Sequence, residues 1–186
     1  MHSCNNDDAV MEVGWDEARE LGDVALLSAK LSLEAKGALP PVSLLLTAEG
    51  LGLVELDFRS PEAKRLSFMA LKSLAREQGA VGAVTVTDAW TYAASGPAAL
   101  ELREMQEEHV SIDDVVAAAG GEEKKREAIC VLVETKMRAL LLVQTYDRVA
   151  GRPSVVFDGP PRELDTMTSP ECGGQMFVLY EEGHKS

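Results

Sequence analysis

The sequence predicts one α+β domain: a mainly antiparallel, twisted sheet of about five to seven strands, with two long helices packed on one face. Three observations lead to this class. Two segments carry apolar residues at helical spacing, and several strand-like segments follow one another with short turns between them. Hydrophobic residues make up 46% of the 186 residues, which is enough for one self-sufficient core.

The first helix is predicted over residues 15–37. Gly37 is placed to end it, and Pro40 and Pro41 prevent its continuation. Its apolar residues recur at helical spacing: Ala18, Leu21, Val24, Ala25, Leu27 and Leu31. Residues 42–58 then predict two short strands around a turn at Glu49 and Gly50.

The second helix has a strong start signal at Ser60-Pro61-Glu62. A hydroxyl can cap the helix, proline suits its first position, and an acid suits the positive end of its dipole. Gly79 ends it. The predicted buried stripe is Leu66, Met69, Ala70 and Leu74, and its expected partners in the sheet are Val84, Val86, Ile129, Leu132 and Leu140.

The remaining strands are predicted at 80–90, on both sides of a break at Lys136-Met137, and in "PSVVFDG". "QMFVLYEE" predicts a last strand. We expect a flexible tail at 1–12, one domain over 13–160 and a C-terminal extension at 161–186. Residues 93–126 combine many acids, glycines and few large apolar side chains, and therefore predict a loosely packed insertion within the domain.

Charge and composition exclude several functions. A formal net charge of −13 repels phosphate backbones, so direct nucleic-acid binding is not expected. There is no long apolar run for a membrane span and no signal-peptide pattern at the N-terminus. The three cysteines are scattered, and Cys130 lies in an apolar run typical of a core residue. We therefore expect a cytoplasmic protein.

The order of these elements, with a strand that ends in Thr-Asp-Ala-Trp at 87–90 and a later "REAICVLVET" strand, resembles a group of uncharacterised bacterial and phage-associated proteins. Their corresponding strand ends in Ser/Thr-Glu/Asp-Ala-Trp. The resemblance would cover residues 15–160. It implies an α+β domain and no particular activity. The long insertion after Trp90 and the pair Lys136-Met137 depart from the pattern of the group.

One enzymatic hypothesis comes from "VLVETK" at 131–136. Glu134 and Lys136 have the Glu-x-Lys spacing of a metal-dependent nuclease strand, and Asp88 is the obvious second carboxylate for Mg²⁺. Antiparallel pairing of the two strands would, however, place Asp88 near Glu127, about seven residues or roughly 20 Å from Glu134. Glu-x-Lys alternation is also common on an exposed strand face, and we favour that interpretation of Glu134 and Lys136.

The aromatic residues at the end of the 80–90 strand suggest a binding site. Trp90 and Tyr92 share a strand face, and with Asp88 they could form a binding lip for a partner or an apolar ligand. The competing interpretation, which we favour for Trp90, is that it covers the edge of the core. The sequence has no His-x-x-x-His pair and no phosphate-binding glycine motif, so we expect no cofactor and no bound metal.

Three functions stay open. The favoured one is a non-enzymatic binding or accessory protein with a protein partner or a homo-oligomeric form. The others are the nuclease-like enzyme, and an acidic mimic of nucleic acid that occupies a basic surface.

Overall fold

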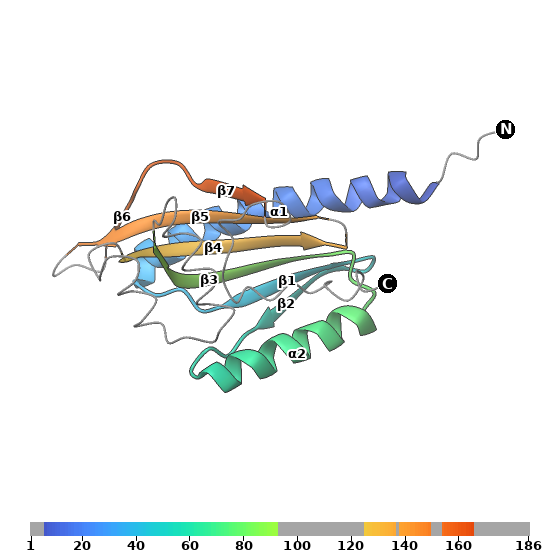
Figure 1. Ribbon diagram of the computed structural model, residues 1–186, viewed down its shortest axis with the longest axis horizontal. Coiled ribbons are helices and arrows are strands. Elements are labelled where there is room, and N and C mark those ends of the chain that lie inside the picture. Colours follow the sequence, from blue (N-terminus) through green and yellow to red (C-terminus); the bar gives the residue numbers. More distant parts are fainter. Residues whose placement is uncertain (1–5, 93–124, 137, 150–153, 166–186) are drawn as a thin grey trace, which may run out of the picture.

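The computed structural model describes residues 6–92, 125–136, 138–149 and 154–165 (Figure 1); for 6–13, Tyr92, Lys125 and Asp165 only the backbone is described. Two helices and seven strands occur in these ranges. They are α1 (Asn6–Lys36), β1 (Val42–Thr47), β2 (Gly50–Glu55), α2 (Pro61–Glu77), β3 (Gly82–Tyr92), β4 (Lys125–Thr135), β5 (Ala139–Arg148), β6 (Val155–Phe157) and β7 (Arg162–Asp165). The predicted insertion and the "QMFVLYEE" strand lie outside the described residues. Neither described helix is long and apolar enough to cross a membrane.

The strands form one antiparallel sheet in the order β2-β1-β3-β4-β5-β6, and β7 also pairs with β5. This confirms the predicted α+β class with a mainly antiparallel sheet. β6 pairs with the last residues of β5 and β7 with its first half, so these two short strands share one edge. β7 lies in the predicted C-terminal extension, ahead of the "QMFVLYEE" segment that was predicted to form a last strand.

The turns and caps form for the reasons that the sequence suggested. The Ser60 hydroxyl accepts a hydrogen bond from the backbone N–H of Ala63 at 3.1 Å, and Pro61 occupies the first turn of α2. Gly37 and Gly79 follow α1 and α2 with φ angles of 68° and 59°, the left-handed conformation that glycine adopts without strain. The first helix begins at Asn6, well before the predicted start at Trp15.

The two helices pack on opposite faces of the sheet, which corrects the prediction that both lie on one face (Figure 1). Successive residues of a strand point to opposite faces. Val84 of β3 belongs to the core cluster beneath α1, whereas the preceding Ala83 belongs to the cluster beneath α2. The central strands are apolar on both faces, so each face needs its own cover.

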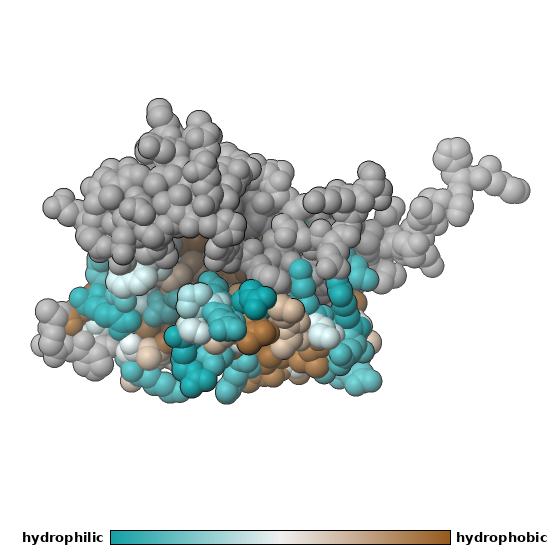
Figure 2. Space-filling view, turned by 60° about the horizontal axis from the view of Figure 1, so that its bottom comes forward, coloured by the Kyte–Doolittle hydropathy of each residue, from teal (hydrophilic) through white to brown (hydrophobic). Residues whose placement is uncertain are grey.

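The buried stripe of α2 is also different from the predicted one. Phe68, Leu71 and Ala75 are buried, whereas Leu66 and Met69 are more than half exposed and Ala70 is exposed as well. Of the predicted stripe, Leu74 alone packs against the core beneath α2, and it is partly buried. Both sets have helical spacing, and Phe68 gains a ring contact with Phe58, whose centroid lies 5.5 Å away. Figure 2 shows the molecule from the α2 side, where apolar residues lie at the surface among hydrophilic ones. The expected partners Val84, Val86 and Ile129 pack beneath α1 instead.

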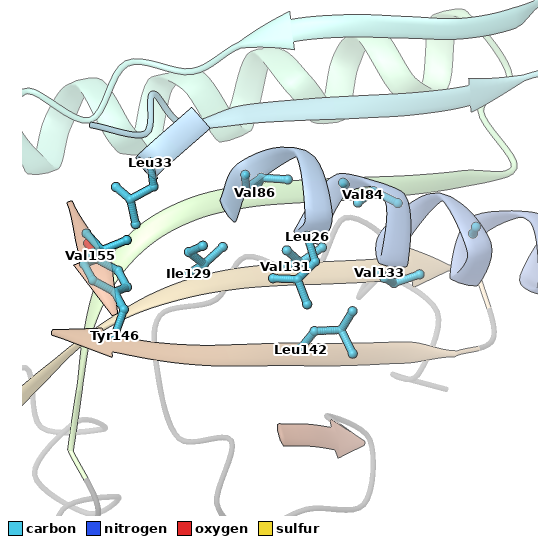
Figure 3. Close-up of a cluster of buried hydrophobic side chains, with 13 residues drawn as sticks. Leu26, Leu33, Val84, Val86, Ile129, Val131, Val133, Leu142, Tyr146 and Val155 are labelled. Carbon is cyan, nitrogen blue, oxygen red and sulfur yellow. The ribbon is translucent and has the colours of Figure 1, made fainter. Parts of the chain in front are cut away.

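Small residues bring α1 very close to β3 and β4. Its sheet-facing side includes Ala18, Gly22, Ala25 and Ala29, all buried. A methyl group at Gly22 would overlap Cγ2 of Val133, because the helix backbone lies directly on that side chain. Leu26 and Leu33 fill the core beside this line of contact (Figure 3).

The position of α2 predicts a clear contrast between two leucines. Leu71→Ala should lower the free energy of unfolding by about 2–4 kcal/mol, because it truncates a fully buried side chain and leaves a cavity in its place. Leu66→Ala should change it by less than about 0.5 kcal/mol, because Leu66 is 51% exposed. Urea denaturation of both variants checks this. A larger loss for Leu66→Ala would contradict the observed phase of α2.

Candidate functional site

The sheet separates the residues of the nuclease hypothesis. Asp88 pairs with Ile129 and points to the α1 face, whereas Glu134 pairs with Ala83 and points to the opposite face. Ile129 precedes Glu134 by five positions, a separation of roughly 17 Å along the strand. Two carboxylates on opposite sides of a sheet cannot share one metal ion.

Glu134 and Lys136 do not form an exposed strand face either. Glu134 is buried, and Lys136 is an exposed residue just beyond the end of β4. The alternation failed as a guide because the second face of β4 is buried as well: Cys130 and Leu132 of β4 form a core cluster there with Leu141 and Val143 of β5. Within the described ranges, no group of three histidine, cysteine or acidic side chains is placed to hold a metal ion.

Asp88 instead belongs to a polar cluster at the end of the α1 face. The Tyr146 hydroxyl donates to Oδ1 of Asp88 at 2.7 Å, and Nη2 of Arg148 donates to the Tyr146 oxygen at 3.2 Å. Nε of Arg148 donates to both carboxylate oxygens of Glu127 at 2.9 Å. Nη1 of Arg148 donates to the Gly37 carbonyl at 2.7 Å. Arg148 therefore ties β3, β4, β5 and the end of α1 together.

Burial sets the protonation of this cluster. Desolvation raises the pKa of Asp88, with Glu127 adding to the increase, while the Tyr146 hydroxyl and Arg148 act against it. Desolvation and the hydrogen bond to Asp88 raise the pKa of Tyr146 above its usual range. Tyr146 is thus a protonated donor near neutral pH. Donors and acceptors that satisfy one another in this way are typical of a structural clamp rather than of an acid–base pair awaiting a substrate.

Tyr146 closes the core at this end, in the place that the sequence assigned to Trp90. The Tyr146 side chain is 1% exposed and packs with Ile129, Leu33 and Val155 (Figure 3). Trp90 is 55% exposed, so its interpretation as a core residue is wrong. Trp90 lies opposite Glu127 on β4, which in turn lies opposite Tyr146 on β5. Tyr92 continues β3, and its side chain is not among those described.

Sequence reasoning missed Tyr146 and Arg148. Their signal is the spacing Tyr146-x-Arg148, which puts a ring and a cation on one strand face beside the acid at 127. The guanidinium of Arg148 lies 5.6 Å from the centre of the Tyr146 ring, which adds a cation–π contact. The spacing Tyr-x-Arg is short and common. It indicates a site only once the strand register is known to place Asp88 near Tyr146 and Arg148.

A hollow beside α2 carries less chemistry than the Asp88 cluster. It is lined by Pro41, Glu55, Leu56, Asp57, Phe58, Arg59 and Ser67. Of its two carboxylates, Asp57 is held by Arg59, which lowers the pKa of Asp57 to about 2. Asp57 and Arg59 bind each other at the surface, and the residues that line this hollow form no convergent set of reactive groups.

The described acids are partly neutralised by neighbouring arginines. Arg19 pairs with Asp23 and Glu163, and Arg126 pairs with Asp147 and Asp158. A nucleic-acid mimic presents acids that are free to meet a basic partner, and these four acids are already paired within the chain.

The chain matches no protein-family model, no curated protein and no solved structure. The resemblance based on the Thr-Asp-Ala-Trp segment therefore stays a prediction, and the site must be interpreted from its own geometry.

The raised pKa of Asp88 predicts how stability depends on pH. In the unfolded chain the carboxyl ionises near its ordinary value of 3.8, and in the folded protein it ionises at higher pH. As pH rises above 3.8, the unfolded state loses its proton first, so wild-type protein loses stability relative to Asp88→Asn until the folded carboxyl also ionises. Urea unfolding of both proteins, from below pH 3.8 to neutrality, measures this difference. A wild-type protein that gains stability relative to Asp88→Asn over that range would show that Arg148 and Tyr146 outweigh desolvation.

Proposed function

We propose that this protein is a non-enzymatic cytoplasmic binding protein, and that its contact site for a protein partner is centred on Trp90. The observation that carries the proposal is the 55% exposure of a tryptophan at the end of a rigid central strand. Tryptophan is among the residues that contribute most at protein interfaces, because its large ring buries much area and loses little conformational entropy.

The neighbours of Trp90 support a role in recognition. The cluster of Asp88, Glu127, Tyr146 and Arg148 ties together the strands beside it. Glu127 is the cross-strand neighbour of Trp90, and Glu127 and its ion-pair partner Arg148 both keep part of their side chains exposed. A partner with an apolar pocket and polar groups at its rim fits this arrangement. The same cluster argues against catalysis, since its reactive groups are already bound to one another.

Capture from a native extract of the source cells tests the proposal. Immobilised wild-type protein should retain a partner that Trp90→Ala loses, because truncation of a central tryptophan costs about 2 kcal/mol or more. Leu66→Ala, which also shortens an exposed apolar side chain but lies on α2, is the matched control and should retain the partner.

The purified partner should then change Trp90 fluorescence in a Trp15→Phe background. That substitution removes the second tryptophan, which packs beside the α1 core. Identical retention by wild-type and Trp90→Ala protein, or a partner that leaves the fluorescence unchanged, would contradict a contact at Trp90.

A further inference from the structure

The helix α1 is apolar on two opposite sides. One side, which includes Ala18, Ala25 and Ala29, is buried on the sheet. The other side carries Val24, Leu27 and Leu31 at i, i+3, i+7 spacing, and each of them is more than half exposed. We call these three residues the outer stripe. A surface helix normally has one apolar side, and a helix with two belongs between two layers of structure.

The sheet has a matching surface on the same side of the molecule. α1 packs on β3 and β4, and β1 and β2 run beside it with α2 behind them (Figure 3). On the α1 face, β2 carries Leu51 and Leu53, whose cross-strand neighbours on β1 are Leu46 and Leu44. Leu51 and Leu53 are 58% and 65% exposed, and Leu44 and Leu46 are partly buried. We call these four leucines the floor.

The outer stripe and the floor are complementary, and one chain carries both. A single copy cannot bring them together, because the outer stripe points away from its own sheet. We propose that two copies of this chain associate about a two-fold axis, so that the outer stripe of each packs on the floor of the other. The two α1 helices then form one layer between two sheets, and each helix is buried on both of its apolar sides.

The sizes and charges set conditions on this pairing. A stable complex needs roughly 800 Å² from each partner, more than one short helix stripe provides, so the two symmetric contacts must form together. The stripe and the floor contain no charged residue, whereas each copy carries a net charge of −13. Added salt should therefore tighten the association, because it screens the repulsion between copies and leaves the apolar contact intact.

Sedimentation equilibrium of the full chain tests the proposal. Wild-type protein should be a dimer, and Leu27→Lys and Leu53→Glu should each be monomeric with an unchanged circular dichroism spectrum, because each substitution puts a charge into both symmetric contacts. Leu66→Glu changes a leucine of similar exposure that lies on α2, on the other face of the sheet, and this variant should stay dimeric. A monomeric wild-type protein would overturn the proposal and would leave both surfaces to another partner. A dimer that tolerates both substitutions would also overturn it.

Mixing the two monomeric variants tests the geometry itself. In a mixed pair, one contact joins an unchanged stripe to an unchanged floor, and the other places the lysine of Leu27→Lys opposite the glutamate of Leu53→Glu. The mixture should therefore recover the dimer that neither variant forms alone. A mixture that stays monomeric would overturn the packing of stripe on floor, because a dimer held by stripe against stripe or floor against floor gains nothing from mixing. Trp90→Ala should dimerise as wild type, so loss of the Trp90 contact and loss of the dimer are separate results.

Discussion

The close packing of α1 against β3 and β4 is the constraint on which the rest of the structure depends. Gly22 lets the helix backbone lie on Val133, and Ala18 lies within 3.2 Å of the position that a side chain on Gly82 would take. A methyl group on Gly22 would lie 2.4 Å from Cγ2 of Val133, which leaves no room for it, and one on Gly82 would require its neighbours to move by a few tenths of an ångström. Such shifts are costly, since protein interiors are packed as densely as organic crystals. The rotation of α1 about its axis is therefore fixed by steric fit as much as by the hydrophobic effect.

Both proposed surfaces follow from that rotation. With the small residues against the sheet, Val24, Leu27 and Leu31 must face outward, and the β1–β2 half of the sheet is left beside the helix rather than beneath it. The end of α1 is fixed as well, so the Gly37 carbonyl meets Arg148, which orders the strand ends below Trp90. The proposed dimer contact and the proposed Trp90 contact thus lie on different parts of one frame.

Local signals predicted the elements well, and the three-dimensional arrangement only in part. The Ser60 cap, the turn before Gly50 and the break after Lys136 depend on neighbouring residues, and the structure has each of them. Which apolar stripe of a helix is buried depends on the part of the sheet that the helix packs against, and local sequence patterns do not reveal that packing. In α2, Leu66 and Met69 suggested the wrong side, because Phe68, Leu71 and Ala75 offer a second apolar stripe with the same helical spacing. In α1, the sheet-facing side includes Ala18, Gly22, Ala25 and Ala29, which a search for large apolar residues does not single out. The candidate site needed the register that places Tyr146 and Arg148 near Asp88.

Two glycines in the same helix provide the most direct test of the central claim. Gly14→Ala should raise the free energy of unfolding by up to about 1 kcal/mol, since alanine favours helix and the nearest atom, Cγ2 of Val81, would lie 3.9 Å from the new methyl group. Gly22→Ala should lower it by about 1–3 kcal/mol in spite of the same helical preference, because the methyl group meets Val133. Val133→Ala should cost less in the Gly22→Ala background than in wild type. Equal stabilisation by both glycine substitutions in urea denaturation would contradict the close packing of α1 on the sheet.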